Sequence, residues 1–327
     1  MSSNDIQLST IQAAYKRIKE QIVPLRITKS TSLSEKLNAE ILLAHEYLQV
    51  TGAFKFRGAL NAVLQLSEAD KKIGVVAVST GNHGKALAYA ASQAGVPCII
   101  CMSNLVPKNK VDAIRALGAD TRIIGQSQDE AEIEVNRLVK EEGYVMLPPF
   151  EHPHIIAGQG TLGLEMLEQV PDVGTVLVQV SGGGLISGIA RAIKSQKPDV
   201  RIIGISMERG CAMITSQRAG KPVEVEELPT LADSLGGGIG LDNRWTFDMV
   251  RELVDDLVLL TEDEIAAGIR HAYFEEQVII EGSGSVGIAA LLAGKVKPKG
   301  KTIALLSGKN IDMQLHQKII NQQDYEL

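Results

Sequence analysis

Short apolar segments alternate with helix-like segments through most of the chain. Between residues 73 and 148, strands are expected at 75–78, 98–102, 121–125 and 145–147, and helices at 82–93, 108–117 and 129–142. A second series begins with a helix at 161–168 and a strand at 175–180, and it ends with a strand at 302–306 and a helix at 313–320. Such alternation is typical of parallel sheets covered by helices. The sequence therefore predicts an α/β protein with two open, twisted parallel sheets.

The composition fits a globular protein that does not bind nucleic acid. At 327 residues the chain exceeds the ~250–300 residues at which single cores stop growing, so two domains are expected. The net charge of −6, the pI of about 5.6 and the lack of any basic block argue against nucleic-acid binding. No apolar run approaches the ~18 residues needed to span a bilayer. We therefore expect a cytoplasmic protein without membrane contact.

A lysine stands between two phenylalanines in the segment 51–58, TGAFKFRG, where Lys55 lies between Phe54 and Phe56. Lysines usually keep their ammonium group in water. In an apolar setting the lysine pKa falls, and the neutral amine becomes a nucleophile toward carbonyl groups, as in a Schiff-base lysine. Taken alone, this segment favours an ordinary surface lysine, so the reading depends on the rest of the chain.

Three consecutive glycines follow the apolar run that ends at residue 180. Gly182, Gly183 and Gly184 lie between this run and a helix that is expected to begin near Leu185. Glycines let a backbone approach an anion closely, and a helix N-terminus offers free amides and the positive end of its dipole. The segment predicts a phosphate site, although a plain strand–helix turn would also use glycine.

The glycine loop matches neither common nucleotide motif. A dinucleotide fingerprint needs glycine at the sixth position counted from Gly182, where this chain has Ser187. A P-loop needs Gly-Lys-Ser/Thr after the glycines, and the chain lacks it. Glu208, at the end of the next apolar run, has the place of a ribose-binding acid. An NAD-dependent oxidoreductase therefore remains a remote alternative.

Two further strand-like runs end in small polar residues. The run 75–78 is followed by Ser79, Thr80, Gly81, Asn82 and His83. Their hydroxyls, amide and backbone N–H groups can form a nest of donors for a carboxylate. Taken alone, His83 favours a capping or surface histidine over a catalytic one. The last run ends at Ser307, a candidate to meet a ring nitrogen.

In order and spacing these segments resemble the fold type II pyridoxal-phosphate (PLP) enzymes, the tryptophan synthase β-like fold. The segment 156–161, IAGQGT, is also similar to that family. The resemblance covers about residues 11–312 and looks most like the threonine dehydratase and serine racemase branch. It implies a large PLP-binding domain of residues 1–67 and 150–327, a small open-sheet domain of residues 73–148, PLP in the cleft between them, and a homodimer.

The resemblance assigns roles to residues at matching positions. Lys55 would hold PLP as a Schiff base and then act as the base at Cα of the substrate, with Phe54 near the ring. Asn82 would bind the phenolic oxygen and Ser307 would face the pyridine nitrogen, while the phosphate would be bound by Gly182, Gly183, Gly184 and Leu185. A neutral hydroxyl at the nitrogen weakens the electron sink and favours β-elimination. The implied reaction is that of an ammonia-lyase, which converts a β-hydroxy amino acid to a 2-oxo acid and ammonia.

Some positions depart from the family pattern. Thr80 replaces the serine that serine racemases use on the opposite ring face, so an amino-acid racemase is an alternative. Glu208 and Ala212 match two positions of a divalent-metal site, but Ile214 replaces the third, an aspartate, and no metal is expected. Glu281 is retained beside the cofactor ring with smaller neighbours than in relatives.

The loop 232–240, ADSLGGGIG, bears on the substrate. In relatives a side chain of this loop meets the substrate, whereas Gly237 leaves room for a larger β-substituent. This variant most resembles the hydroxyectoine-utilisation dehydratases. The expected substrate contacts are Ser79, Thr80, Gly81, Asn82, His83 and Gly237.

Cys98 and Cys101 have the spacing of a redox or zinc pair but fall inside an expected strand. Residues three apart on a strand point to opposite faces, so buried structural thiols are the better interpretation.

Overall fold

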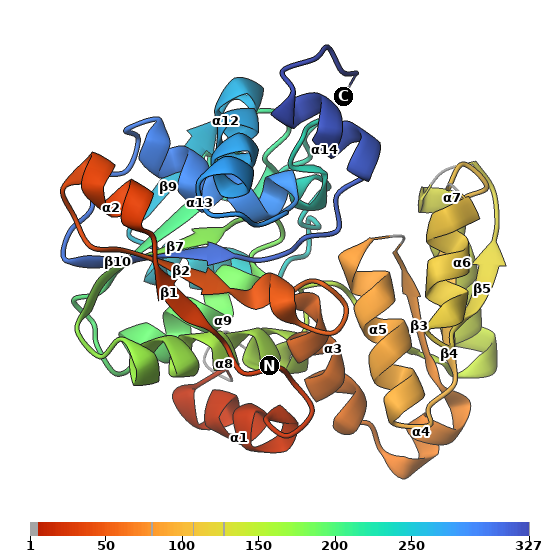
Figure 1. Ribbon diagram of the computed structural model, residues 1–327. Coiled ribbons are helices and arrows are strands. Elements are labelled where there is room, and N and C mark those ends of the chain that lie inside the picture. Colours follow the sequence, from red (N-terminus) through yellow and green to blue (C-terminus); the bar gives the residue numbers. More distant parts are fainter. Residues whose placement is uncertain (1–5, 80, 107, 127, 327) are drawn as a thin grey trace.

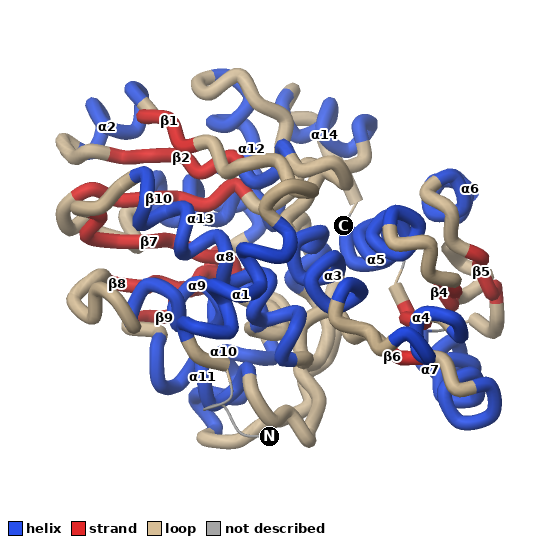
Figure 2. The backbone as a smooth tube through the Cα atoms, turned by 90° about the horizontal axis from the view of Figure 1, so that it is seen from below, coloured by secondary structure: helices blue, strands red, loops and turns tan. Residues whose placement is uncertain are grey.

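The computed structural model describes residues 6–79, 81–106, 108–126 and 128–326, and these form two separate sheets (Figures 1 and 2). The larger sheet has, in spatial order, β1 (Ile27–Lys29), β2 (Ile41–His45), β10 (Lys301–Leu306), β7 (Val173–Gln179), β8 (Arg201–Met207) and β9 (Asp256–Leu260). The smaller has β5 (Asp120–Ile123), β4 (Cys98–Met102), β3 (Val75–Val78) and β6 (Val145–Met146). The predicted α/β fold with two sheets is confirmed. The predicted domain bounds stay a prediction.

One strand departs from the expected parallel arrangement. All pairs in the smaller sheet are parallel, as are the pairs from β2 through β10, β7 and β8 to β9. β1 instead pairs with β2 in the antiparallel sense. An antiparallel edge strand is a common addition to a parallel sheet, and an antiparallel pair does not need a long crossover connection. The sequence analysis did not predict this short strand.

Helices cover both faces of the larger sheet (Figure 1). On one side lie α1 (Leu8–Ile18), α8 (Pro153–Gln169) and α9 (Gly184–Lys194), and on the other α12 (Glu262–Phe274), α13 (Gly282–Leu292) and α14 (Met313–Ile320). The apolar residues of α11 (Thr246–Leu253) pack into the same core as those of α9. Val176 and Val178 of β7 pack into the first core, and Leu177 between them packs into the second. Because side chains alternate along a strand, a strand buried on both faces is apolar throughout.

The smaller sheet is covered in the same way. The helices around it are α3 (Lys55–Leu64), α4 (Glu68–Ile73), α5 (Asn82–Gln93), α6 (Lys108–Ala116) and α7 (Gln128–Arg137), and the last is extended by a π-helical turn over Leu138–Glu142. Cys98 and Cys101 belong to the cores on its opposite faces. Both are free and buried, and burial raises the pKa of Cys98 to about 12. The expectation of buried structural thiols is confirmed.

The remaining helical segments are α2 (Thr31–Leu37), α10 (Ala212–Ala219) and two 3₁₀ turns at Glu46–Leu48 and Asp233–Leu235. Within the described parts of the chain, no helix is both long and apolar enough to cross a membrane.

The helix α8 begins at Pro153, well before the predicted start at residue 161. Its glycines lower helix propensity, which explains the late prediction. They lie, however, where other helices come very close. A Cβ on Gly158 would lie 2.7 Å from the Arg57 carbonyl oxygen of α3, and a Cβ on Gly160 would lie 2.9 Å from the Gly188 carbonyl oxygen of α9. Tertiary packing therefore overrides the local preference.

Candidate active site

A pocket opens at the carboxyl ends of β7 and β10, which is where open α/β sheets bind ligands. All the predicted cofactor contacts line it: Phe54, Lys55, Asn82, Gly182, Gly183, Gly184, Leu185, Glu281 and Ser307. Asn82 begins α5 beside the smaller sheet, whereas the glycine loop joins β7 to α9 of the larger sheet. The pocket is therefore formed by both parts of the molecule.

Lys55 is the first residue of α3, and its amine lies inside the pocket. Nζ donates a hydrogen bond to the Pro149 carbonyl oxygen at 2.8 Å and lies 5.2 Å from the centre of the Phe54 ring. Burial lowers the pKa of Lys55 to about 8, although the nearby carboxylate of Glu281 acts in the opposite direction. The amine is therefore much closer to its neutral, nucleophilic form at physiological pH than an ordinary lysine.

The glycine loop has no room for side chains. Gly183 has a φ of +87°, a conformation that favours glycine, and α9 starts at the next residue. A Cβ on Gly184 would lie 2.9 Å from the carbonyl oxygen of Phe150, and one on Gly182 would run into the ring of Phe150. The first amides of α9, which have no partner within the helix, adjoin the pocket. This arrangement fits a phosphate group.

The end of β10 joins the lysine segment. The carbonyl oxygen of Ser307 accepts a hydrogen bond from the Phe54 N–H at 3.0 Å, and Ala53 forms a β-bridge with Gly308. Ser307 is buried and lines the pocket. Two other buried lining atoms, Gln179 Oε1 and Ser283 Oγ, have no hydrogen-bond partner among the described residues. Because buried polar atoms are nearly always paired, these atoms indicate a polar ligand.

A hydrogen-bond network closes one side of the pocket. Asn82 Nδ2 donates to Glu281 Oε1 at 2.8 Å, and Asn82 Oδ1 accepts from Asn310 Nδ2 at 2.6 Å. The Asn310 N–H donates to Glu281 Oε2 at 2.9 Å. Burial, and then repulsion from Asp233, raise the pKa of Glu281 to about 7 despite these hydrogen bonds. The pKa values of both Glu281 and Lys55 are therefore shifted toward neutral pH.

Of the predicted substrate contacts that the structure describes, only Asn82 lines the pocket. Ser79 Oγ accepts a hydrogen bond from the Gly84 N–H at 3.0 Å, and Thr80 lies outside the described residues. Gly81 is exposed at the start of α5, and Gly237 is half-buried in its loop. The assigned substrate contacts stay a prediction.

His83 is buried in the first turn of α5, so of the two ordinary roles expected for it, capping or surface histidine, the surface one is wrong. Its Nε2 lies 2.8 Å from the Leu147 carbonyl oxygen. Burial, and then the charge of Lys55, lower the pKa of His83 to about 3, so that its ring stays neutral. The sequence did not indicate this burial, because its hydrogen-bond partner, Leu147, is 64 residues away along the chain, just after β6.

Several lining residues were missed by the sequence analysis: Phe150, Gln179, Ser181, Ser234, Leu235 and Ser283. Ser181 and Ser283 adjoin predicted site residues, so sequence proximity could have indicated them. Ser234 and Leu235 belong to the loop 232–240, which the sequence analysis linked to the substrate, whereas nothing local distinguishes Phe150.

The weak metal positions show no sign of a shared site. Glu208 Oε1 lies 3.8 Å from Lys295 Nζ, and Ala212 is buried at the start of α10. Among the residues that the structure describes, no group of three or more His, Cys, Asp or Glu side chains could hold a metal ion.

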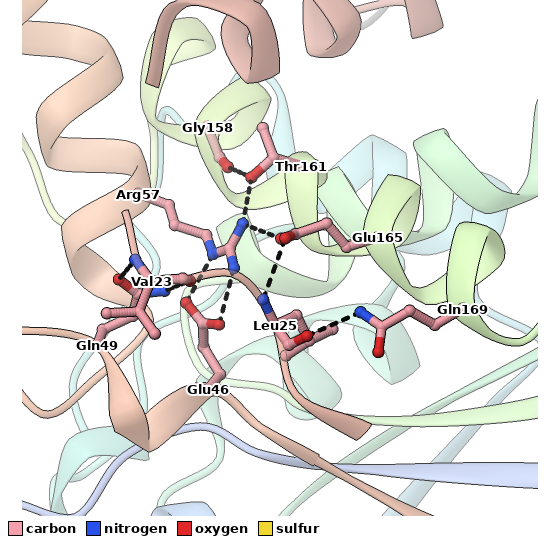
Figure 3. Close-up of polar contacts among 9 residues, drawn as sticks. All are labelled: Val23, Leu25, Glu46, Gln49, Arg57, Gly158, Thr161, Glu165 and Gln169. Atoms are coloured by element: carbon pink, nitrogen blue, oxygen red, sulfur yellow. Dashed lines mark hydrogen bonds and ion pairs between the residues drawn. The ribbon is translucent and has the colours of Figure 1, made fainter. Parts of the chain in front are cut away.

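Behind Lys55, the next polar residue of α3 is held in a buried charge cluster (Figure 3). Arg57 is fully buried and forms two hydrogen bonds with Glu46, from Nε to Oε1 at 2.6 Å and from Nη2 to Oε2 at 3.0 Å. Its Nη1 pairs with Glu165 of α8 and donates to Thr161 Oγ1 at 3.1 Å. The cluster fixes the start of α3, and therefore Lys55, to α8.

Comparison with known proteins identifies the family. The family model described as "Pyridoxal-phosphate dependent enzyme" matches residues 18–308. The chain belongs to this family of PLP enzymes. Its members use PLP, and the pocket offers a glycine cradle, an amine and unpaired polar atoms that fit this cofactor. The resemblance and the cofactor inferred from the sequence are confirmed.

The relatives are threonine-degrading enzymes and a racemase. A Sinorhizobium fredii protein, provisionally named a threonine dehydratase, is 56% identical over 97% of this chain and 96% of its own. The L-threonine ammonia-lyase of Thermotoga maritima is 43% identical over 97% of this chain and 78% of its own. Maize serine racemase superimposes with a TM-score of 0.90 at 32% identity and 97% coverage of both chains. This PLP enzyme is therefore a lyase of the threonine dehydratase kind with a type II fold.

Proposed function

We propose that this PLP enzyme removes water from a β-hydroxy amino acid to give an enamine, which takes up water again and yields a 2-oxo acid and ammonia, with Lys55 as the catalytic residue. One observation carries the proposal. The amine of Lys55, with a pKa of about 8, shares one pocket with the glycine loop, Asn82 and Ser307. Those groups supply, in one place, the amine, the phosphate cradle and the ring contacts that the reaction requires.

Each pocket residue has a separate role in this reaction. When bound, PLP withdraws electrons from Cα of the amino acid, which makes loss of a proton and of the β-hydroxyl possible. The neutral amine of Lys55 takes the proton from Cα, because its lowered pKa suits a general base near neutral pH. The amides of Gly182 to Leu185 would hold the phosphate, while Phe54 and Asn82 would orient the ring. Ser307 would give the ring nitrogen a neutral partner, which favours elimination.

We infer further that the substrate carries a larger β-substituent than threonine, as a β-hydroxy amino acid from hydroxyectoine breakdown would. This inference is supported by the loop around Gly237. A Cβ at Gly237 would have no heavy atom within 4 Å among the described residues, so the loop leaves space. The cytoplasmic location and the homodimer remain predictions from the sequence.

A racemase is the second candidate. The fold matches maize serine racemase with a TM-score of 0.90, and Thr80 retains a hydroxyl at the position that racemases use. Racemisation requires a proton to be returned to the opposite face of Cα. The two functions are separable because only elimination releases ammonia.

The test combines the cofactor spectrum with product analysis. The purified protein should show a visible absorption band that borohydride abolishes, and Lys55→Ala should lack it. A control variant, Lys71→Ala, should keep the band, because Lys71 pairs with Glu68 on the surface of α4. L-threonine, L-serine and hydroxyectoine-derived amino acids are then compared for ammonia release and for loss of optical purity. A protein that binds no PLP, or releases no ammonia from any of them, would contradict the proposal.

A further inference from the structure

A carboxylate outside the pocket receives four hydrogen bonds. Glu151 Oε1 accepts from the Arg244 N–H at 2.6 Å and from the Trp245 N–H at 2.7 Å. Its Oε2 accepts from the Thr246 N–H at 3.2 Å and from Thr246 Oγ1 at 2.8 Å. These donors surround the N-terminus of α11, so Glu151 caps a helix that is about 95 residues away along the chain. Such charge-assisted hydrogen bonds are among the stronger ones in proteins.

The residues just before Glu151 reach the candidate site. The Pro149 carbonyl oxygen accepts the hydrogen bond from Lys55 Nζ at 2.8 Å. Phe150 lines the pocket and packs against Gly182 and Gly184 closely enough to exclude any side chain there. Three consecutive residues therefore contact the lysine, the glycine loop and α11 in turn.

The helix that Glu151 caps also supports the glycine loop. Thr246 is fully buried, and a Cβ on Gly183 would lie 2.9 Å from the Cβ of Thr246. The hydroxyl of Thr246 is the one that donates to Glu151. The loop 149–151 thus touches the glycine loop on one side directly, and on another side through Thr246.

We propose that Glu151 is a positioning residue that keeps Lys55 and the glycine loop in the relative positions that PLP binding requires. This inference rests on the proposed function, because it assumes that Lys55 and the glycine loop bind PLP. A carboxylate suits the task because both of its oxygens only accept hydrogen bonds. A glutamine would place an amide donor against two of the four donors. The loop would then shift, and with it Pro149, Phe150 and the support for Gly183.

The experiment compares three full-length proteins loaded with PLP: wild type, Glu151→Gln and Asp255→Asn. Asp255 is the matched control, because its Oδ2 accepts from the Ile202 N–H at 2.7 Å near the amino end of β8, away from the pocket. The dissociation constant of PLP is measured by absorbance titration. Trp245 is the only tryptophan of the chain, and its backbone N–H donates to Glu151, so a shift of this backbone segment should alter its fluorescence.

Glu151→Gln should weaken PLP binding by about tenfold or more, the scale expected for losing hydrogen bonds to a charged group. It should also change the emission of Trp245 and shift the absorption band of bound PLP, while Asp255→Asn changes none of these. A merely structural role would lower thermal stability in both variants and leave the PLP dissociation constant and band unchanged, which would overturn the proposal.

A second pair of variants covers the case in which Glu151→Gln does not fold. Thr246→Val removes the hydroxyl donor and Thr246→Ser keeps it, so only the valine variant should weaken PLP binding. Equal PLP affinity in these two variants would also overturn the proposal. If the wild type itself binds no PLP, the proposed function fails instead. This outcome is distinct from the one in which wild type and variants bind PLP equally well, which overturns only the role of Glu151.

Discussion

Replacing Arg57 by methionine should destabilise the folded protein strongly. Arg57 is fully buried, and its guanidinium neutralises two carboxylates that are also buried, those of Glu46 and Glu165 (Figure 3). The methionine would fill similar space but leave both carboxylates without a cation. Breaking a buried ion pair in this way costs about 3–5 kcal/mol, because an uncompensated charge remains in a medium of low polarity.

The loss of stability in Arg57→Met should depend on pH, and the direction of this dependence follows from the pKa of Glu46. Burial raises the pKa of Glu46, and attraction to Arg57 opposes this rise. Without Arg57 the folded-state pKa of Glu46 rises further above its unfolded value. The variant is then least impaired at acid pH, where Glu46 is protonated in both states. Its stability relative to wild type falls as pH increases between the two pKa values, by up to about 1.4 kcal/mol per pH unit for one proton.

The assay is urea denaturation followed by far-UV circular dichroism at pH 5 and pH 8. Arg122→Met serves as the control, because Arg122 is 41% exposed and forms only long surface ion pairs, worth about 0–1 kcal/mol. Adding Glu46→Gln and Glu165→Gln to Arg57→Met should recover most of the loss and remove its pH dependence. A loss for Arg57→Met below about 1 kcal/mol, or an equal loss at both pH values, would refute this reasoning.

Three further predictions concern the pocket and its support. Gly158→Ala should destabilise the protein by about 1–3 kcal/mol, because its Cβ would lie 2.7 Å from the Arg57 carbonyl oxygen; unchanged denaturation would show that α3 and α8 can separate at no cost. The rate at which the apo-protein binds PLP covalently should rise with pH around a midpoint near 8, because only the neutral amine of Lys55 attacks the PLP aldehyde. The rate is measured by stopped-flow absorbance, and a midpoint above pH 10 would contradict the lowered pKa of Lys55. Gly237→Ala should lower the free energy of unfolding by about 1–2 kcal/mol, because Gly237 has a φ of +93°, which a residue with a Cβ adopts only with strain. The space around this Cβ is open, so the loss should come from the backbone alone. An unchanged free energy of unfolding would mean that the loop relaxes.

Much of the site could be predicted because several of its residues lie in short, recognisable sequence motifs. The three glycines before Leu185 and the lysine between two phenylalanines are local patterns, and both lie in the pocket. The order of strands and helices follows from local hydrophobic patterning. The capping box of Thr261 and Glu264 likewise starts α12 through local hydrogen bonds.

Other features could not be predicted because they join distant segments. Glu281 and Asn82 are 199 residues apart, yet they share a hydrogen bond that places them in one network. The burial of His83 depends on the chain at Leu147. The early start of α8 depends on how closely α3 and α9 approach its glycines.

The sequence by itself determined the type of fold, the elements that form it and the residue types available for chemistry. These depend on backbone preference and on the spacing of apolar residues, which act over a few positions. Only the tertiary structure decided the protonation equilibria of the site and the contacts that hold it. The pKa of Lys55 is set by burial and by Glu281, and its amine is held by Pro149, a residue 94 positions away. Desolvation and electrostatic interaction act through space, so they exist only once the chain has brought these residues together.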